Sequence, residues 1–329
     1  MRAAWDVIVR VWLVAATWIA LRRRAPGRRA RLGRIVDPLG FARAAIAPAA
    51  GHVALAIAML PRGRREEARI TLLACRALHA FARPDAVVAG KRRDAVVAAV
   101  RYLAGERDAP PPPPHADRTG ATHLDGMLAA RLTVLRAALE ALPGDAMRRS
   151  RAMIELVGEG LLRMDADRRA GAAQVLGEAV SYAARLAAPS VRPPDAACRA
   201  AGRALASARE LAGVPAALLR AWLRSRAQPT LTDVVRLARW LPATAGRGTR
   251  AAAALLVATA CAEPLRHANA TRPPRLPHPV RAALAAAWSR SAYLADVAAL
   301  DRAIRGVVAD GAERAPHRAD PGELREISA

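Results

Sequence analysis

Aromatic residues, cysteine and lysine are all scarce in this chain of 329 residues. Aromatic residues make up 3% of it, β-branched residues are few, and strong helix formers dominate. This composition argues against an all-β or doubly wound α/β fold. The three cysteines, Cys75, Cys198 and Cys261, lie too far apart for a zinc site and are too few for a disulfide framework. They favour a reducing compartment.

Motifs that would identify an enzyme directly are also missing. The sequence contains no glycine-rich phosphate loop, no nucleophile elbow and no D-x-x-x-D pattern. Its seven histidines are scattered, and an isolated histidine most often has a structural role. No metal site is therefore predicted from local spacing.

The charge is strongly one-sided. The chain has 52 basic and 28 acidic residues, a formal net charge of +24, and Lys91 is its single lysine. Such an excess attracts anions, including nucleic acid, acidic lipid and phosphorylated ligands. Nucleic-acid binding is the weakest of these three interpretations, because the sequence has no helix-turn-helix signature and no aromatic residues interleaved with the arginines.

The N-terminal region combines an apolar run with a basic cluster. Residues 7–21 are apolar except for Arg10, and arginines crowd residues 22–34. Fifteen residues are fewer than the ~20 that a membrane-spanning helix needs. The apolar run precedes the arginines and no cleavage pattern follows, which disfavours a signal peptide. Residues 1–35 are therefore expected to anchor at a membrane surface or to pack on the core as a terminal helix.

The remainder reads as helices punctuated by proline and glycine. We predict helices near residues 40–60, 64–82, 85–105, 123–142, 146–166, 169–188, 195–213, 215–225, 230–241, 249–268 and 279–309. The proline run at 110–114 is expected to be an exposed loop within one domain. The predicted organisation is a single all-α domain over residues 36–312, followed by a polar flexible tail at 313–329.

Four stretches carry a further pattern. Residues 58–85 have a Leu-Pro turn and then a helix containing LLACRAL, and residues 153–187 contain GEGLLRMDADRR and SYAARLA. Residues 198–214 read CRAAGRALASARELAGV, and residues 239–267 combine Leu-Pro with Arg247 and Arg250. In this order, they resemble the motifs of squalene and phytoene synthases, the head-to-head prenyl transferases. The resemblance spans about residues 40–270.

This resemblance implies an isoprenoid-synthase-type helical bundle around a central apolar cavity. The diphosphate end of a prenyl ligand would lie near residues 76–83 and 205–213. By position, Tyr182 matches the tyrosine of the family's YCxxVAG stretch and is the candidate catalytic residue. The candidate diphosphate-binding residues are Arg76, His79, Arg83 and Arg209, and the candidate cavity acids are Asp165 and Glu210.

The departures from the family pattern affect its metal site. Family members hold Mg²⁺ with two aspartate-rich motifs, because a departing diphosphate needs divalent cations to neutralise it. Here the first pair of aspartates is replaced by His79 and Arg83, and the second motif falls at Arg209 and Gly213. Two interpretations follow. The arginines bind diphosphate directly, or the site has decayed and they only occupy surface or cavity positions.

We therefore expect a family-like protein that does not catalyse Mg²⁺-dependent prenyl transfer. No cofactor is predicted for it. Its partners would be a prenyl diphosphate, an isoprenoid lipid or an active synthase for which it is a helper subunit. The alternative is an active transferase that uses Mg²⁺ to condense two C15 or C20 prenyl diphosphates. The expected location is the cytoplasm, with peripheral attachment to the inner face of the membrane left open.

Overall fold

A computed structural model describes the following parts of the chain: residues 32–50, 53–60, 62–83, 91–114, 120–164, 167–187 and 289–313. Shorter pieces are described at 195–196, 198–200, 202–203, 232, 235, 238–239, 250, 254, 281–282 and 285–286. The predicted helices between 195 and 268 fall mostly outside these residues, as do residues 1–31 and the tail from 314.

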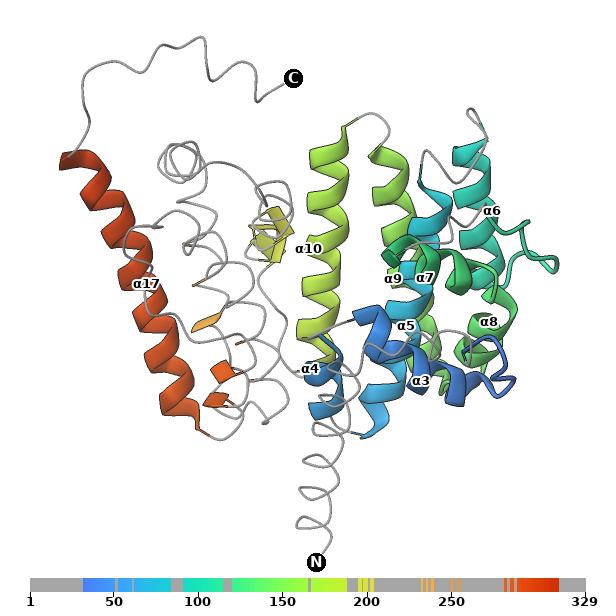
Figure 1. Cartoon of the computed structure of the whole chain (residues 1–329), viewed down its shortest axis with the longest axis horizontal. Coiled ribbons are helices and arrows are strands. Elements are labelled where there is room, and N and C mark those ends of the chain that lie inside the picture. Colours follow the sequence, from blue (N-terminus) through green and yellow to red (C-terminus); the bar gives the residue numbers. More distant parts are fainter. Residues whose placement is uncertain are drawn as a thin grey trace, which may run out of the picture.

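Within the described residues every regular element is an α-helix, which confirms the all-α prediction. The helices are α3 (Pro38–Ala50), α4 (Val53–Met59), α5 (Arg62–Phe81), α6 (Arg92–Ala104), α7 (Gly120–Ala129), α8 (Leu132–Glu140), α9 (Gly144–Arg163), α10 (Arg168–Ala187) and α17 (Arg290–Glu313). Helices α3 to α10 gather in one bundle, and α17 lies on the far side of α10 (Figure 1). No described helix has the length and apolar character needed to cross a bilayer.

Helix α5 is the central element of the bundle and contacts each of the other helices from α3 to α10. Its sequence explains this position, because apolar residues recur every three or four positions from Ile70 onward. Ile70, Leu73, Leu78 and Phe81 are fully buried and belong to the main hydrophobic core. The helix that carries the first motif of the resemblance therefore also organises the fold.

Helices α9 and α10 form a close antiparallel pair at glycines. A Cβ atom at Gly160 would meet the side chain of Val175, and one at Gly171 would meet Met164 and the carbonyl oxygen of Gly160. Because these contacts leave no room for a side chain, the two backbones approach closely near the turn that joins them. Both helices pack on α5.

The expected helix at 123–142 is two helices, α7 and α8, separated at Ala130 and Arg131. No glycine or proline marks this break, which tertiary contacts stabilise instead. The Arg131 guanidinium donates to the carbonyl oxygens of Gly33, at 2.9 Å, and Ile35. It also lies 5.4 Å from the centroid of the Phe41 ring. These contacts hold residues 33–35 against the bundle, and the neighbouring Leu32 is buried.

Side-chain caps set the beginnings of two helices. The Asp37 carboxylate accepts from the backbone N–H of Gly40 at 2.7 Å, and Pro38 occupies the first position of α3. At α17 the hydroxyl oxygen of Ser289 accepts from the backbone N–H of Ala292 at 3.2 Å. Ser289 is itself non-helical, so the predicted helix at 279–309 is interrupted there. Cap formation explains the interruption.

Helix α17 packs on short pieces that precede it in the sequence. The buried Tyr293 hydroxyl donates to the carbonyl oxygen of Ala238 at 2.7 Å. The carboxylate of Asp301 accepts from Arg239 at 2.8 Å and from Arg305 at 3.0 Å. These contacts join α17 to residues 238–239.

Candidate functional site on the central helix

The hydroxyl group of Tyr182 reaches from α10 to the buried face of α5. Its oxygen lies 2.9 Å from the hydroxyl oxygen of Thr71 and donates to the Glu67 carboxylate at 3.2 Å. Burial is the main reason that the pKa of Tyr182 is raised above its usual value. The phenol is therefore a neutral hydrogen-bond donor at neutral pH, and it is unsuited to act as a base.

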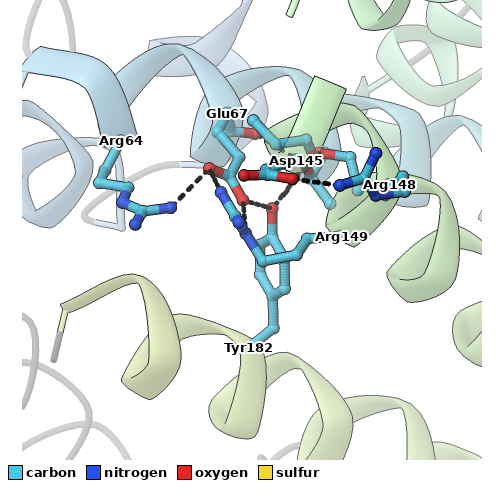
Figure 2. A network of polar contacts seen from close by, with 9 residues as sticks. Arg64, Glu67, Asp145, Arg148, Arg149 and Tyr182 are labelled. Carbon is cyan, nitrogen blue, oxygen red and sulfur yellow. Dashed lines mark hydrogen bonds and ion pairs between the residues drawn. The ribbon is translucent and has the colours of Figure 1, made fainter. Parts of the chain in front are cut away.

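Glu67 is the charged centre of this cluster, and its side chain is 0% exposed. Arg149 from α9 binds it at two points, with Nε 2.9 Å from Oε1 and Nη2 2.8 Å from Oε2. Arg64, one turn earlier on α5, adds a third ion-pair contact at 3.2 Å. Figure 2 shows both guanidinium groups beside the carboxylate and the Tyr182 ring rising toward it. The hydrogen bond to Glu67 raises the pKa of Arg149.

Two helix hydroxyls complete the cluster. Thr71 donates to the backbone carbonyl of Glu67 at 2.7 Å, and Ser150 lies 2.8 Å from the carbonyl oxygen of Ala146. The hydroxyl oxygens of Thr71 and Ser150 are themselves 2.8 Å apart. We call Arg64, Glu67, Thr71, Arg149, Ser150 and Tyr182 the Glu67 cluster. It ties α5, α9 and α10 together through groups that are all hydrogen-bonded, which is the arrangement that makes a buried polar network stabilising.

A second polar contact joins α5 to α7. Nε of Arg76 donates to Oδ1 of Asp125 at 2.6 Å, and the two side chains are 28% and 17% exposed. His79 lies one turn further along α5, and Arg83 lies just beyond its end. Both are partly buried. Three of the four predicted diphosphate-binding residues therefore follow one another along this end of α5.

The structure does not bring Tyr182 together with Arg76. Thr71, which contacts Tyr182, and Arg76 are five positions apart, so they project roughly 140° apart around the helix axis. Their partners confirm the separation, because Tyr182 comes from α10 and Asp125 comes from α7. Tyr182, the candidate catalytic residue, and Arg76, a candidate diphosphate-binding residue, therefore contact different sides of the central helix.

The remaining predicted site residues, Asp165, Arg209 and Glu210, lie outside the described residues. Two important acids were missed by sequence reasoning. Glu67 carried a signal, since it falls on the same helix face as the buried Ile70, Thr71 and Ala74, where a charge needs a partner. No sequence signal marked Asp125, because its partner Arg76 is 49 positions away.

Among the described residues, no group of three or more His, Cys, Asp or Glu side chains lies close enough together to hold a metal ion. Comparisons of the chain with protein-family models, with curated proteins and with solved structures give no match.

Proposed function

We propose that this chain is a squalene/phytoene synthase-like protein that binds a prenyl diphosphate or an isoprenoid lipid without Mg²⁺-dependent prenyl transfer. A helper role beside an active synthase belongs to the same proposal. The observation that carries it is the chemistry of α5, where Arg76 and His79 stand on the helix that would bear the family's first aspartate motif. The carboxylate that reaches Arg76 there, Asp125, is already bound to it.

The arrangement of the helices supports the proposal. The first two stretches of the resemblance fall on α5 and on the pair α9 and α10, and these three helices pack on one another. Tyr182 points from α10 toward Glu67 and Thr71 of α5 (Figure 2), on a different side of that helix from Arg76. Its network of hydrogen bonds favours a structural role over a catalytic one, because its proton already has acceptors within the fold.

The charges near Arg76 support anion binding over metal-dependent transfer. His79 and Arg83 replace the two carboxylates of the family motif, and neither side chain offers a hard oxygen ligand for Mg²⁺. Arginine binds phosphate oxygens directly through its planar fork of N–H groups. A net charge of +24 also favours a multiply charged anion or an acidic membrane surface. The location we propose is the cytoplasm, with peripheral attachment at the inner face of the membrane as the alternative.

The test is incubation of the full chain with farnesyl or geranylgeranyl diphosphate and NADPH, in parallel samples containing Mg²⁺ or EDTA. Calorimetry measures binding, and mass spectrometry measures extracted hydrocarbon. Binding that persists in EDTA without hydrocarbon formation supports the proposal. A C30 or C40 hydrocarbon formed only with Mg²⁺ would establish the active transferase instead. If the chain neither binds the diphosphate nor forms a hydrocarbon, both the binding proposal and the active-transferase alternative are wrong.

A further inference from the structure

We infer that Asp125 is a built-in competitor for Arg76, so that an anionic ligand must displace this carboxylate before the guanidinium can bind it fully. The inference rests on the proposed function, because it concerns the same end of α5, and it adds a residue that sets the affinity of that site. Asp125 belongs neither to the motifs of the resemblance nor to the predicted site.

The geometry of the pair carries this inference. The contact is a single short hydrogen bond of 2.6 Å, from Nε of Arg76 to Oδ1 of Asp125. The two terminal nitrogens of the Arg76 guanidinium take no part in this hydrogen bond. Arg149, in contrast, contacts both carboxylate oxygens of Glu67. A single-point contact holds the arginine in position but leaves most of its donors facing elsewhere.

The exposure of the carboxylate separates this pair from the Glu67 cluster. The Glu67 side chain is 0% exposed, whereas that of Asp125 is 17% exposed. The arginines are alike in this respect, at 28% for Arg76, 29% for Arg64 and 38% for Arg149. Water and a soluble anion can therefore reach the Arg76–Asp125 pair. Partial burial also strengthens the interaction between the two charges relative to bulk water.

Electrostatics gives the direction of the effect. While Asp125 is in place, Arg76 is neutralised and the carboxylate repels any incoming anion. A diphosphate, with several negative charges, can compensate for the loss of that contact, whereas a singly charged anion gains less from Arg76. Asp125 thus favours the binding of ligands with several negative charges over the binding of singly charged anions. Removing its charge should tighten the binding of every anion that uses Arg76.

The experiment measures binding of inorganic pyrophosphate to the full chain by calorimetry, in EDTA and at low salt. The variants are Asp125→Asn, Arg76→Gln and the double variant, and Glu140→Gln is the matched control. Glu140 forms an exposed ion pair with Arg136 on α8, so its substitution removes the same charge elsewhere. Asn has the shape of Asp and keeps an oxygen that can accept from Arg76. Circular dichroism and thermal unfolding check that each variant is folded.

We expect Asp125→Asn to bind pyrophosphate at least tenfold more tightly than the wild type and Glu140→Gln to change affinity less than twofold. In the Arg76→Gln background, Asp125→Asn should have a much smaller effect, because only the direct repulsion between the carboxylate and the anion remains to be removed. The competitor role is wrong, and the proposed function stands, if three results are found together: the wild type binds pyrophosphate, Arg76→Gln weakens this binding, and Asp125→Asn does not strengthen it. If neither the wild type nor Asp125→Asn binds, diphosphate binding itself is wrong.

Discussion

Glu67 and Arg149 form a two-point ion pair across the α5–α9 interface, although 82 positions separate them in the sequence. The carboxylate is fully buried and the guanidinium is partly exposed. A buried carboxylate held in this way cannot lose its charge without leaving two arginines, Arg149 and Arg64, uncompensated.

This pair predicts the most damaging single substitution in the cluster. Glu67→Gln should lower the free energy of unfolding by about 2 kcal/mol, because the partly exposed Arg149 and Arg64 lose charge-assisted hydrogen bonds to a buried carboxylate. Urea unfolding followed by circular dichroism measures the change. The control is Glu140→Gln, which removes an exposed i, i+4 pair and should cost about 0.5 kcal/mol or less. Equal losses in the two variants would contradict the structural role of Glu67.

Two buried phenols should make the fold sensitive to alkali. Burial is the main reason that the pKa values of Tyr182 and Tyr293 are raised. In the unfolded chain tyrosine ionises near pH 10, whereas the folded phenols keep their protons. The folded state therefore binds more protons, so stability falls by about 1.4 kcal/mol per pH unit per phenol above roughly pH 10.

Unfolding free energies measured between pH 9 and pH 11.5 check this expectation. Tyr182→Phe should reduce the slope, and adding Tyr293→Phe should reduce it further. A slope that is the same in all three proteins would show that these phenols ionise normally. At neutral pH Tyr182→Phe should cost about 1 kcal/mol, because the hydroxyl contacts to Thr71 and Glu67 are lost.

The thiols of Cys75 and Cys198 should be inert in the folded protein. Burial raises the pKa of Cys75 to about 12, and burial is also the main cause that raises the pKa of Cys198 to about 11. Only the thiolate reacts with a disulfide reagent such as dithionitrobenzoate. In a Cys261→Ser background at pH 8, we expect no fast reaction until denaturant is added, and then two thiols per chain. Rapid labelling without denaturant would contradict the burial.

Arg83 should contribute to ligand binding. If Arg76, His79 and Arg83 form one anion-binding stretch, Arg83→Glu should abolish farnesyl diphosphate binding while leaving helical content unchanged. The matched control is Arg101→Glu, at an exposed position on α6. Calorimetry in EDTA compares the two variants. Equal affinity of both variants and the wild type would remove Arg83 from the site.

The cap of α3 gives a test of local helix formation. Asp37→Ala should lower the free energy of unfolding by about 1 kcal/mol, because the backbone N–H of Gly40 loses its acceptor. Asp37→Asn keeps an oxygen at the same place and should cost only a few tenths of that. Thermal unfolding in matched buffers distinguishes the two. If Asp37→Asn lost as much unfolding free energy as Asp37→Ala, the charge of Asp37 would matter more than its hydrogen bond.

The all-α class followed from the sequence because helix formers and three- and four-residue apolar spacing are local properties. The break between α7 and α8 did not follow, since the residues around Ala130 and Arg131 favour helix and the contacts of Arg131 with the backbone at Gly33 and Ile35 are distant in sequence. The start of α17 could have been recognised, because Ser289 is a favourable helix cap.

The sequence did not show how the candidate site residues are arranged around α5. Arg76 and His79 lie along one end of this helix, and Tyr182 contacts another side of it, toward α9 and α10. Motif order alone cannot distinguish these sides, because residues five positions apart point in different directions. The pairing of Arg76 with Asp125 depends on how α7 packs on α5, which no local pattern encodes.

Arg131 also offers a path by which a mechanical load on residues 33–35 would enter the bundle. A pull on the chain ahead of Leu32 would act on the buried Leu32 side chain and on the two hydrogen bonds from the Arg131 guanidinium to Gly33 and Ile35. Because Arg131 lies between α7 and α8, part of the tension would pass to the middle of the sequence as well as along the backbone to α3.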